Sequence, residues 1–255
     1  MPARLKVLLF LVEGITDKTS LAMAMTRLIS KNNIQFEIMD GDVTADYRIA
    51  SSAIAKEVGN RVRCFAGRQH FQAKDFYKVV HIIDSDAAFI PDSQILDMSL
   101  SSTLLGADRR IFYDSEQGIW TRNTDDMIRR NQLKQAKVNK LRTLSKVYRS
   151  VPYEIYYMSM NLEHVFYDQP NASREEKVKW ADEKVEELMG DPQSLVRFFD
   201  SPHIALGGAD YQESWNFIET ADNSLKRCSN FNIFFDRARQ DGILQCSHRC
   251  RPAFP

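Results

Sequence analysis

The chain of 255 residues has no surplus of charge of either sign, no dense set of cysteines and no long apolar run. Lys plus Arg and Asp plus Glu both total 34, so the net charge is zero and any basic surface has to be local. Four cysteines are too few to indicate a disulfide-built scaffold. No stretch approaches the length of a transmembrane helix, so we expect no signal peptide, no membrane association and a cytoplasmic location.

Two further absences narrow the class of protein. No glycine-rich Walker loop with its lysine is present, and no internal repeat is visible. Hydrophobic residues make up 44% of the chain and charged residues 27%, which is typical of a globular protein and excludes a broadly disordered one. The length allows one large domain or a domain with an appended region.

Apolar runs alternate with amphipathic stretches along the first 160 residues. Short apolar runs predict strands at 7–12, 34–40, 79–83, 109–114 and 153–159. Helical spacing predicts helices between them, at 16–33, 47–60 and 122–149. This order predicts an α/β fold with a Rossmann-like, mostly parallel sheet flanked by helices.

After residue 160 the pattern becomes helical. The segment 172–190 is a strongly amphipathic helix that ends at a glycine. We expect a helical C-terminal region over 161–242, either packed on the sheet or forming a small subdomain, and a flexible tail over 243–255. The tail holds Cys246, His248 and Cys250, whose number and spacing fall short of a structural zinc site. Whether they bind metal stays open.

Acidic residues follow three of the predicted strands. They are Glu13 after the first strand, Asp40 and Asp42 after the second, and Asp84 and Asp86 after the third. Ligands bind outside the carboxyl ends of parallel strands, where gathered carboxylates repel one another unless a hard divalent cation relieves the cost. Asp17 lies one helical turn past Glu13 and would reach the same edge. The alternative is that these acids only cap turns and helices.

The arrangement Glu13-Gly14-x-Thr16-Asp17 after the first strand, with a later apolar run into Asp84-x-Asp86, resembles the Toprim domain. The form VEGITD is most similar to the OLD-like and M5-like small Toprim nucleases. The resemblance covers residues 5–160 and implies a Toprim-like catalytic domain over 1–160. The chain departs from the family where Ala87 stands after the second aspartate, a position often held by glycine.

The resemblance implies a Mg²⁺-dependent (or Mn²⁺-dependent) nucleic-acid phosphodiesterase, an endonuclease acting on DNA or RNA. Glu13 would be a metal ligand or general acid/base, Asp84 and Asp86 metal ligands, and Asp17 an assisting catalytic residue. Glu163, which opens a helix after the last predicted strand, would be a further metal ligand. A role in anti-phage defence, a separate ATPase or sensor protein as partner, and a homodimeric state are compatible with this resemblance.

The segment 122–149 is the most basic part of the chain, with nine basic residues against Asp125 and Asp126. A basic helix of this kind fits a surface that follows phosphates. The residues that we expect to contact nucleic acid are Arg129, Arg130, Lys134, Lys137 and Lys140. The alternative is a helix face that is merely solvated.

Other functions remain open at this point. The run HIIDSDAAF is similar to the strand and DxD element of GT-A glycosyltransferases, in which Mn²⁺ holds a sugar nucleotide, but that interpretation leaves Glu13 unexplained. A phosphatase of the HAD type would need the paired aspartates on the first strand. A non-catalytic Toprim module that only binds nucleic acid is the third alternative.

Overall fold

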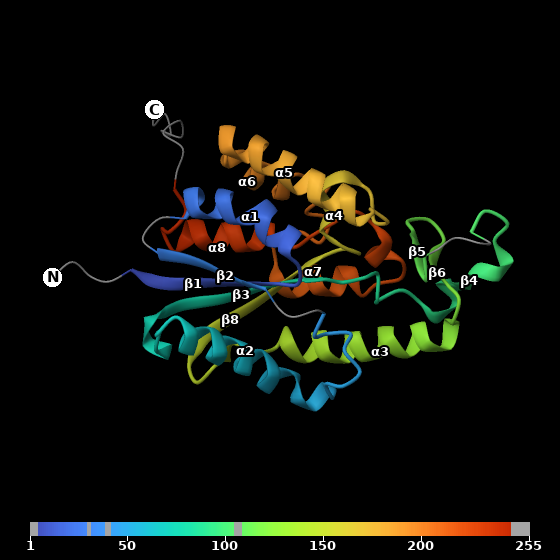
Figure 1. Cartoon of the computed structure of the whole chain (residues 1–255), viewed down its shortest axis with the longest axis horizontal. Coiled ribbons are helices and arrows are strands. Elements are labelled where there is room, and N and C mark those ends of the chain that lie inside the picture. The colour runs from blue at the N-terminus through green and yellow to red at the C-terminus, as the bar shows by residue number, and fades with distance from the viewer. Residues whose placement is uncertain (1–4, 30–31, 39–41, 105–108, 246–255) are drawn as a thin grey trace.

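The computed structural model describes residues 5–29, 32–38, 42–104 and 109–245, and its centre is a five-stranded mixed sheet (Figure 1). From edge to edge the strands are β2 (Asn32–Ile38), β1 (Lys6–Val12), β3 (Phe76–Asp84), β8 (Val151–Met158) and β7 (Lys146–Val147). The first four run parallel, and β7 pairs antiparallel with β8. All residues of β1 from Val7 to Val12 are buried, as expected for a strand covered on both faces. The predicted mostly parallel sheet is therefore confirmed.

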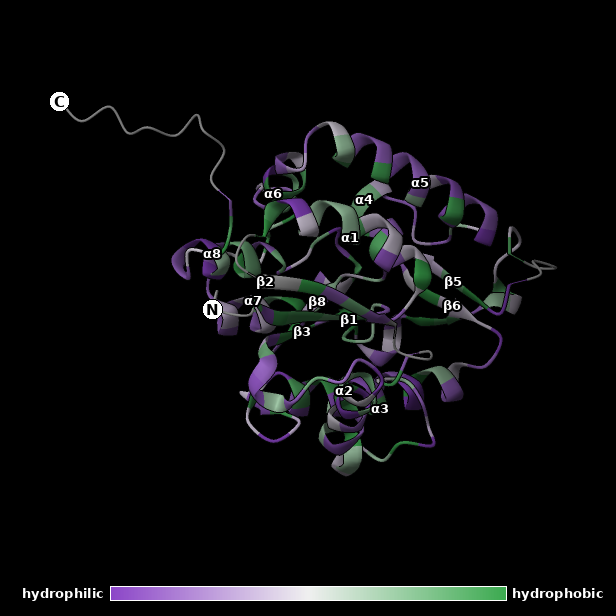
Figure 2. Cartoon of the chain, turned by 60° about the vertical axis from the view of Figure 1, so that its left-hand side comes forward, coloured by the Kyte–Doolittle hydropathy of each residue, from purple (hydrophilic) through white to green (hydrophobic). Residues whose placement is uncertain are grey.

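Helices cover both faces of this sheet, and each face has its own hydrophobic cluster (Figure 1). One cluster includes residues of α1 (Ile15–Leu28), α4 (Leu162–Tyr167), α5 (Arg174–Gly190), α6 (Gln193–Phe199) and α8 (Asn232–Gln240). The other includes residues of α2 (Ile54–Arg68), α3 (Thr124–Leu141) and α7 (Tyr211–Ile218). Figure 2 shows hydrophilic and hydrophobic residues mixed along α5, as expected for a helix with one side in solvent.

A second, three-stranded sheet lies beyond the carboxyl ends of the central strands (Figure 1). Its order is β4 (Ile95–Asp97), β6 (Gly118–Thr121) and β5 (Ile111–Asp114). Gly118 has φ +128° and lies so close to Gln94 that a Cβ would be 2.1 Å from the Gln94 carbonyl oxygen, so this position requires glycine. Short 3₁₀ segments are η1 (Ser51–Ala53), η2 (Ala73–Asp75), η3 (Asp92–Gln94), η4 (Met98–Leu100) and η5 (Asn223–Leu225).

The strand order reverses between β1 and β3. After β1 the chain passes through α1 to β2 on one side, then returns through α2 on the opposite face to β3 on the other side of β1. In open α/β sheets, the crevice at such a reversal, outside the carboxyl ends of the two strands, is the usual place for a ligand. The residues that follow β1 and β3 therefore occupy the most favoured binding position of this fold.

Two predicted elements of the first half differ from the structure. We expected a helix over 47–60 that stops near Gly59, but α2 begins at Ile54 and runs to Arg68. Its buried residues continue the helical spacing on both sides of Gly59, so packing carries the helix through the glycine. The predicted strand 109–114 exists as β5, but it pairs antiparallel with β6 in the small sheet and not with the central strands.

The second half follows the prediction more closely. The long basic helix ends at Leu141, earlier than expected, and the helical C-terminal region is confirmed by α4 to α8. The division into two regions at residue 160 stays a prediction, although the later helices share one hydrophobic cluster with β1 and α1. Leu244, which we expected in the flexible tail, bridges to Ile29 and is buried, and the rest of the expected tail from residue 246 lies outside the described residues. Across the described ranges, none of the helices combines the length and apolar character needed to cross a bilayer.

Candidate active site at the carboxyl edge of the sheet

Four carboxylates gather around the strand-order reversal, and we call them the acid group. They are Glu13, Asp17, Asp84 and Glu163. Glu13 follows β1 directly, and Asp84 is the last residue of β3. Asp17 lies in the first turn of α1, where its carboxylate accepts the Gly14 N–H at 2.9 Å and so caps the helix. The end of one strand and the start of the next helix thus bring Glu13 and Asp17 to the same edge of the sheet, where each interacts with Asp84.

Burial and neighbouring negative charges raise the pKa of three members of the acid group, Glu13, Asp17 and Asp84. Burial, with Asp42 as the next cause, raises the pKa of Glu13 well above its ordinary value. Burial raises the pKa of Asp84 in the same way, with Asp17 and the other acids adding to the effect. Burial raises the pKa of Asp17 to about 6, against the Gly14 hydrogen bond. Without a further cation, the charged forms of Glu13, Asp17 and Asp84 are disfavoured.

Within the acid group, Glu163 is the residue whose negative charge is best compensated by a nearby cation. It lies in α4, just after β8, and its side chain is buried. Its carboxylate pairs with the Lys177 ammonium of α5 at 2.7 Å. The Lys177 pKa is correspondingly raised by Glu163, although burial acts in the opposite direction. Lys134 acts on Glu13 and Asp84 in the same sense, so two ammonium groups serve four carboxyl groups, and one of the two is already paired with Asp42 and Asp86.

The side chain of Glu13 carries an unsatisfied atom. Its Oε1 is buried, and within the part of the chain that the structure describes it has no hydrogen-bond partner. A buried polar atom without a partner costs free energy, about 1 to 3 kcal/mol, and such an atom usually has a functional explanation. A bound cation at this position would supply the missing partner.

Asp86 belongs to a different arrangement, although it is only two residues from Asp84. Lys134 of α3 donates to Asp42 at 2.7 Å and to Asp86 at 2.5 Å, and Arg130 pairs with Asp86 at 2.9 Å. We call Asp42, Asp86, Arg130 and Lys134 the charged bridge. The two cations lower the pKa of Asp86 against the effect of its burial. Tyr113 of β5 also donates to Asp86, at 3.2 Å.

Asp86 is held by a strained turn. Asp86 and Ala87 both have φ 51°, the left-handed region that glycine tolerates best. The Asp86 N–H donates to the Met160 carbonyl at 2.8 Å, which ties the turn to the end of β8. Ala87 stands where the resemblance led us to note a missing glycine, and its backbone adopts the conformation that glycine would favour.

Two of the three lysines of α3 are not presented to solvent. Lys134 and Lys137 are fully buried, and the Lys137 ammonium donates to the carbonyl oxygens of Val43 and Asp46. Contact with nucleic acid, which we expected for these two lysines, is therefore not available to them. Lys140 donates to the Ser52 carbonyl at 2.6 Å. Arg129 is 68% exposed and remains accessible.

The donor set fits a hard divalent cation chemically, but its side chains are not gathered around one point. Among the described residues, no three His, Cys, Asp or Glu side chains meet closely enough to hold a metal ion. The fit rests on the orphaned Glu13 oxygen and on the surplus of carboxylates. Asp40 and the Cys246, His248 and Cys250 set lie outside the described residues.

The chain was compared with protein-family models, with curated proteins and with solved structures, and none of them matches it.

Three residues that pair with acidic side chains of the site were not predicted from the sequence. Lys134 was taken for a surface residue, Lys177 was not considered, and Tyr113 was only part of a predicted strand. A signal for Lys134 was present, because it shares one helical face with Met127, Asn131 and Val138, all of which are buried. Lysines on the apolar face of a helix are buried against an acid more often than they are free.

Proposed function

We propose that the protein is a Mg²⁺- or Mn²⁺-dependent phosphodiesterase that cleaves nucleic acid at the carboxyl edge of its central sheet. The observation that carries this proposal is the acid group at the strand-order reversal, with the buried Glu13 oxygen that lacks a partner. A bound divalent cation would neutralise these carboxylates, polarise a phosphate and lower the pKa of a water molecule.

The residues of the acid group have separate roles in this proposal. Glu13 and Asp84, which follow adjacent strands, would hold the cation, and Glu163 would complete the set from α4. Asp17 would support the same site from the first turn of α1. Burial raises the pKa of Glu13 when no cation is present, and a bound cation would offset that cost, which supports placing Glu13 among the ligands.

Asp86 has a supporting role in this proposal. Its carboxylate is already paired with Lys134 and Arg130, and it fixes the turn that follows Asp84. A glycosyltransferase of the GT-A type would use both acids of the Asp84-x-Asp86 pair for one cation. The Toprim resemblance also implies Asp86 as a metal ligand, so the pairing of Asp86 with Lys134 and Arg130 bears on both candidates alike. What favours the nuclease is Glu13, whose buried oxygen the glycosyltransferase leaves unused.

Two measurements test the proposal together. Plasmid DNA, single-stranded DNA and RNA are incubated with the protein in Mg²⁺ or Mn²⁺, and the thermal midpoint is recorded with and without the metal. We expect metal-dependent cleavage and a metal-dependent rise of the midpoint in the wild type. Both should be lost in Glu13→Gln and Asp84→Asn, because each removes a charged ligand.

Asp182→Asn is the matched control, because it removes one carboxylate from the exposed side of α5. Cleavage and the metal-dependent rise should be unchanged in this variant. Cleavage that survives in Glu13→Gln would contradict the proposed site. Binding of a sugar nucleotide without any cleavage of nucleic acid would favour the glycosyltransferase.

A further inference from the structure

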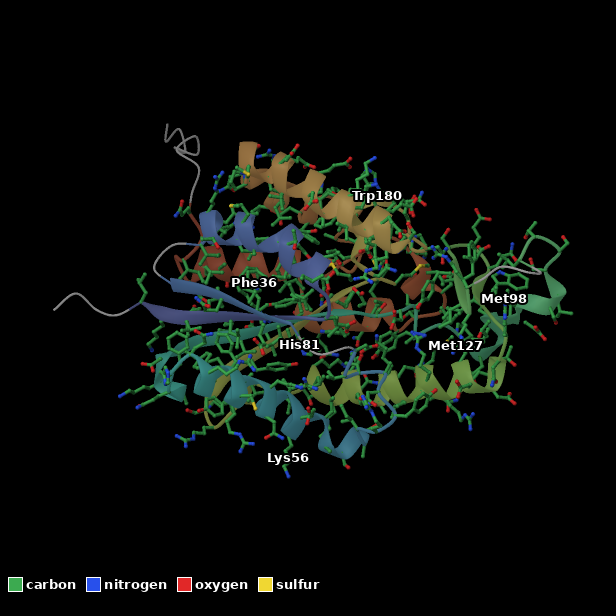
Figure 3. The ribbon with its side chains drawn as sticks, in the orientation of Figure 1. Phe36, Lys56, His81, Met98, Met127 and Trp180 are labelled. Carbon is green, nitrogen blue, oxygen red and sulfur yellow. The ribbon has the colours of Figure 1, made fainter. Side chains whose placement is uncertain are left out.

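A pocket lies beside the charged bridge, between the small sheet and the start of α3. Its volume is about 410 Å³, within the range of small-molecule sites. The side chains that matter for its chemistry are Tyr47, Arg110, Arg122, Asp126, Met127 and Arg130. Met127 of α3 lies below the small sheet, as Figure 3 shows, and is buried. The pocket thus joins an apolar floor to a polar wall.

The charge of this wall is positive. Three arginines, Arg110, Arg122 and Arg130, line the pocket together with one carboxylate, Asp126. Arg110 and Arg122 lie on the exposed side of the small sheet. Guanidinium groups present a planar set of donors that matches the oxygens of a phosphate. Arg130 is already compensated by Asp86, so Arg110 and Arg122 are the arginines that favour an anionic ligand at this pocket.

An aromatic ring completes the pocket on the opposite side. Tyr47 is 55% exposed, which is unusual for a ring of its size, and its hydroxyl donates to the Asp126 carbonyl at 2.9 Å. This hydrogen bond fixes the ring at the rim of the pocket. An exposed ring held in one position is a surface on which a base can stack.

The geometry points to a nucleoside phosphate as the ligand of this pocket, with its base against Tyr47 and its phosphate between Arg110 and Arg122. Arg130 links the pocket to Asp86 at 2.9 Å, so an occupant would lie next to the charged bridge. The ligand is either a free nucleotide or one nucleotide of a strand. If the bound nucleotide belongs to a nucleic-acid strand, the inference rests on the proposed function. If it is a free nucleotide, the inference is independent of that function.

The test measures binding without metal, so that it does not depend on cleavage. The protein is titrated in EDTA with adenosine 5′-monophosphate, adenosine, inorganic phosphate and a ten-nucleotide single-stranded DNA. We expect the nucleotide or the oligonucleotide to bind at least tenfold more tightly than adenosine or phosphate. Arg110→Ala should raise the Kd about tenfold through the lost charge-assisted hydrogen bonds. Tyr47→Ala should raise it by a similar factor, while Tyr47→Phe keeps most of the stacking.

Arg63→Ala is the matched control, because it removes an exposed arginine of α2 outside the pocket. Its Kd should stay within twofold of the wild type. Binding of the mononucleotide identifies a free nucleotide as the source, and binding of the oligonucleotide alone identifies a strand. The inference is overturned if neither binds, or if Arg63→Ala weakens binding as much as Arg110→Ala. If the ligands bind as expected but the protein does not cleave nucleic acid in Mg²⁺, the proposed function is contradicted. The inference about the pocket is then unaffected.

Discussion

Asp84 and Asp86 are separated by one residue at the end of β3, yet their carboxyl groups have opposite surroundings. Asp86 faces two cations, Lys134 and Arg130, which lower its pKa. Asp84 faces Asp17, Asp86 and Glu163, and its pKa is raised, first by burial and then by these acids. The charged bridge is thus a compensated set of charges, whereas the acid group is short of positive charge.

Under the proposed function, this difference would separate a structural use of charge from a functional one. A buried carboxylate that has its cations within the chain holds two elements together, here the turn after β3 and helix α3. Gathered carboxylates with too few cations are costly to folding and are retained where a ligand compensates them. The two parts of one sheet edge therefore differ in charge compensation, and we propose that only the acid group binds a cation.

The largest expected effect comes from removing the cation at the centre of the charged bridge. Lys134→Met should lower the free energy of unfolding by about 3 to 5 kcal/mol, because it leaves Asp42 and Asp86 partly buried without their ammonium. Urea denaturation measures the change. Lys56→Met is the control, since Lys56 is exposed and points away from the protein (Figure 3). If both variants lower the free energy of unfolding equally, the buried Lys134 contributes no more to stability than a surface lysine.

The second prediction compares how the removal of the charge of Asp84 and of Asp86 changes the stability of the protein. Asp86→Asn should destabilise the protein by about 3 kcal/mol, because Lys134 loses a charged partner. Asp84→Asn should be neutral or stabilise it by about 1 kcal/mol in EDTA, because the charged form is disfavoured there. The two substitutions change size and shape equally, so each is the control for the other in urea denaturation. A loss of equal size in both variants would break the comparison.

The sequence alone predicts the central sheet well, because strands such as β1 and β3 are buried on both faces and read as continuous apolar runs. It predicts the small sheet poorly. β4 and β6 are three and four residues long, and no periodicity can be recognised over so short a span. The predicted boundaries of α2 were wrong because packing, and not Gly59, decides where that helix ends.

The candidate site was predictable only where it depends on strand ends. Glu13 and Asp84 follow apolar runs, so their placement at one edge is a consequence of parallel strands. The division between Asp84 and Asp86 depends on Lys134, which lies 48 residues after Asp86 in the chain. A contact over such a distance leaves no local pattern, so the sequence grouped the two aspartates together.

The third prediction concerns the pH dependence of the acid group. The pKa of Asp17 is about 6 in the folded protein and has its ordinary value of 3.8 in the unfolded chain. Between these values the folded state binds more protons, so the stability that Asp17 contributes is fully present below about pH 4 and is lost as the pH rises through 6. The difference in unfolding free energy between wild type and Asp17→Asn should therefore fall by about 1 to 2 kcal/mol from pH 4 to pH 7.

Urea denaturation in EDTA at several pH values measures this difference. Asp182→Asn, on the exposed side of α5, should give a difference that does not vary with pH. A difference that rises with pH would mean that Asp17 is held as a carboxylate by Gly14 and Lys177. In that case the acid group would be compensated like the charged bridge, and the case for a cation would weaken.

The smallest expected effect separates two neighbouring arginines of α3. Arg129 is 68% exposed and pairs with Asp126, which is 54% exposed, so Arg129→Ala should change the free energy of unfolding by less than about 0.5 kcal/mol. Arg130 is 11% exposed and pairs with Asp86, so Arg130→Ala should cost several times more. Both are measured by urea denaturation, and equal losses would mean that Lys134 alone compensates Asp86. The charged bridge would then consist of one lysine between two aspartates, and Arg130 would be free to serve the pocket beside it.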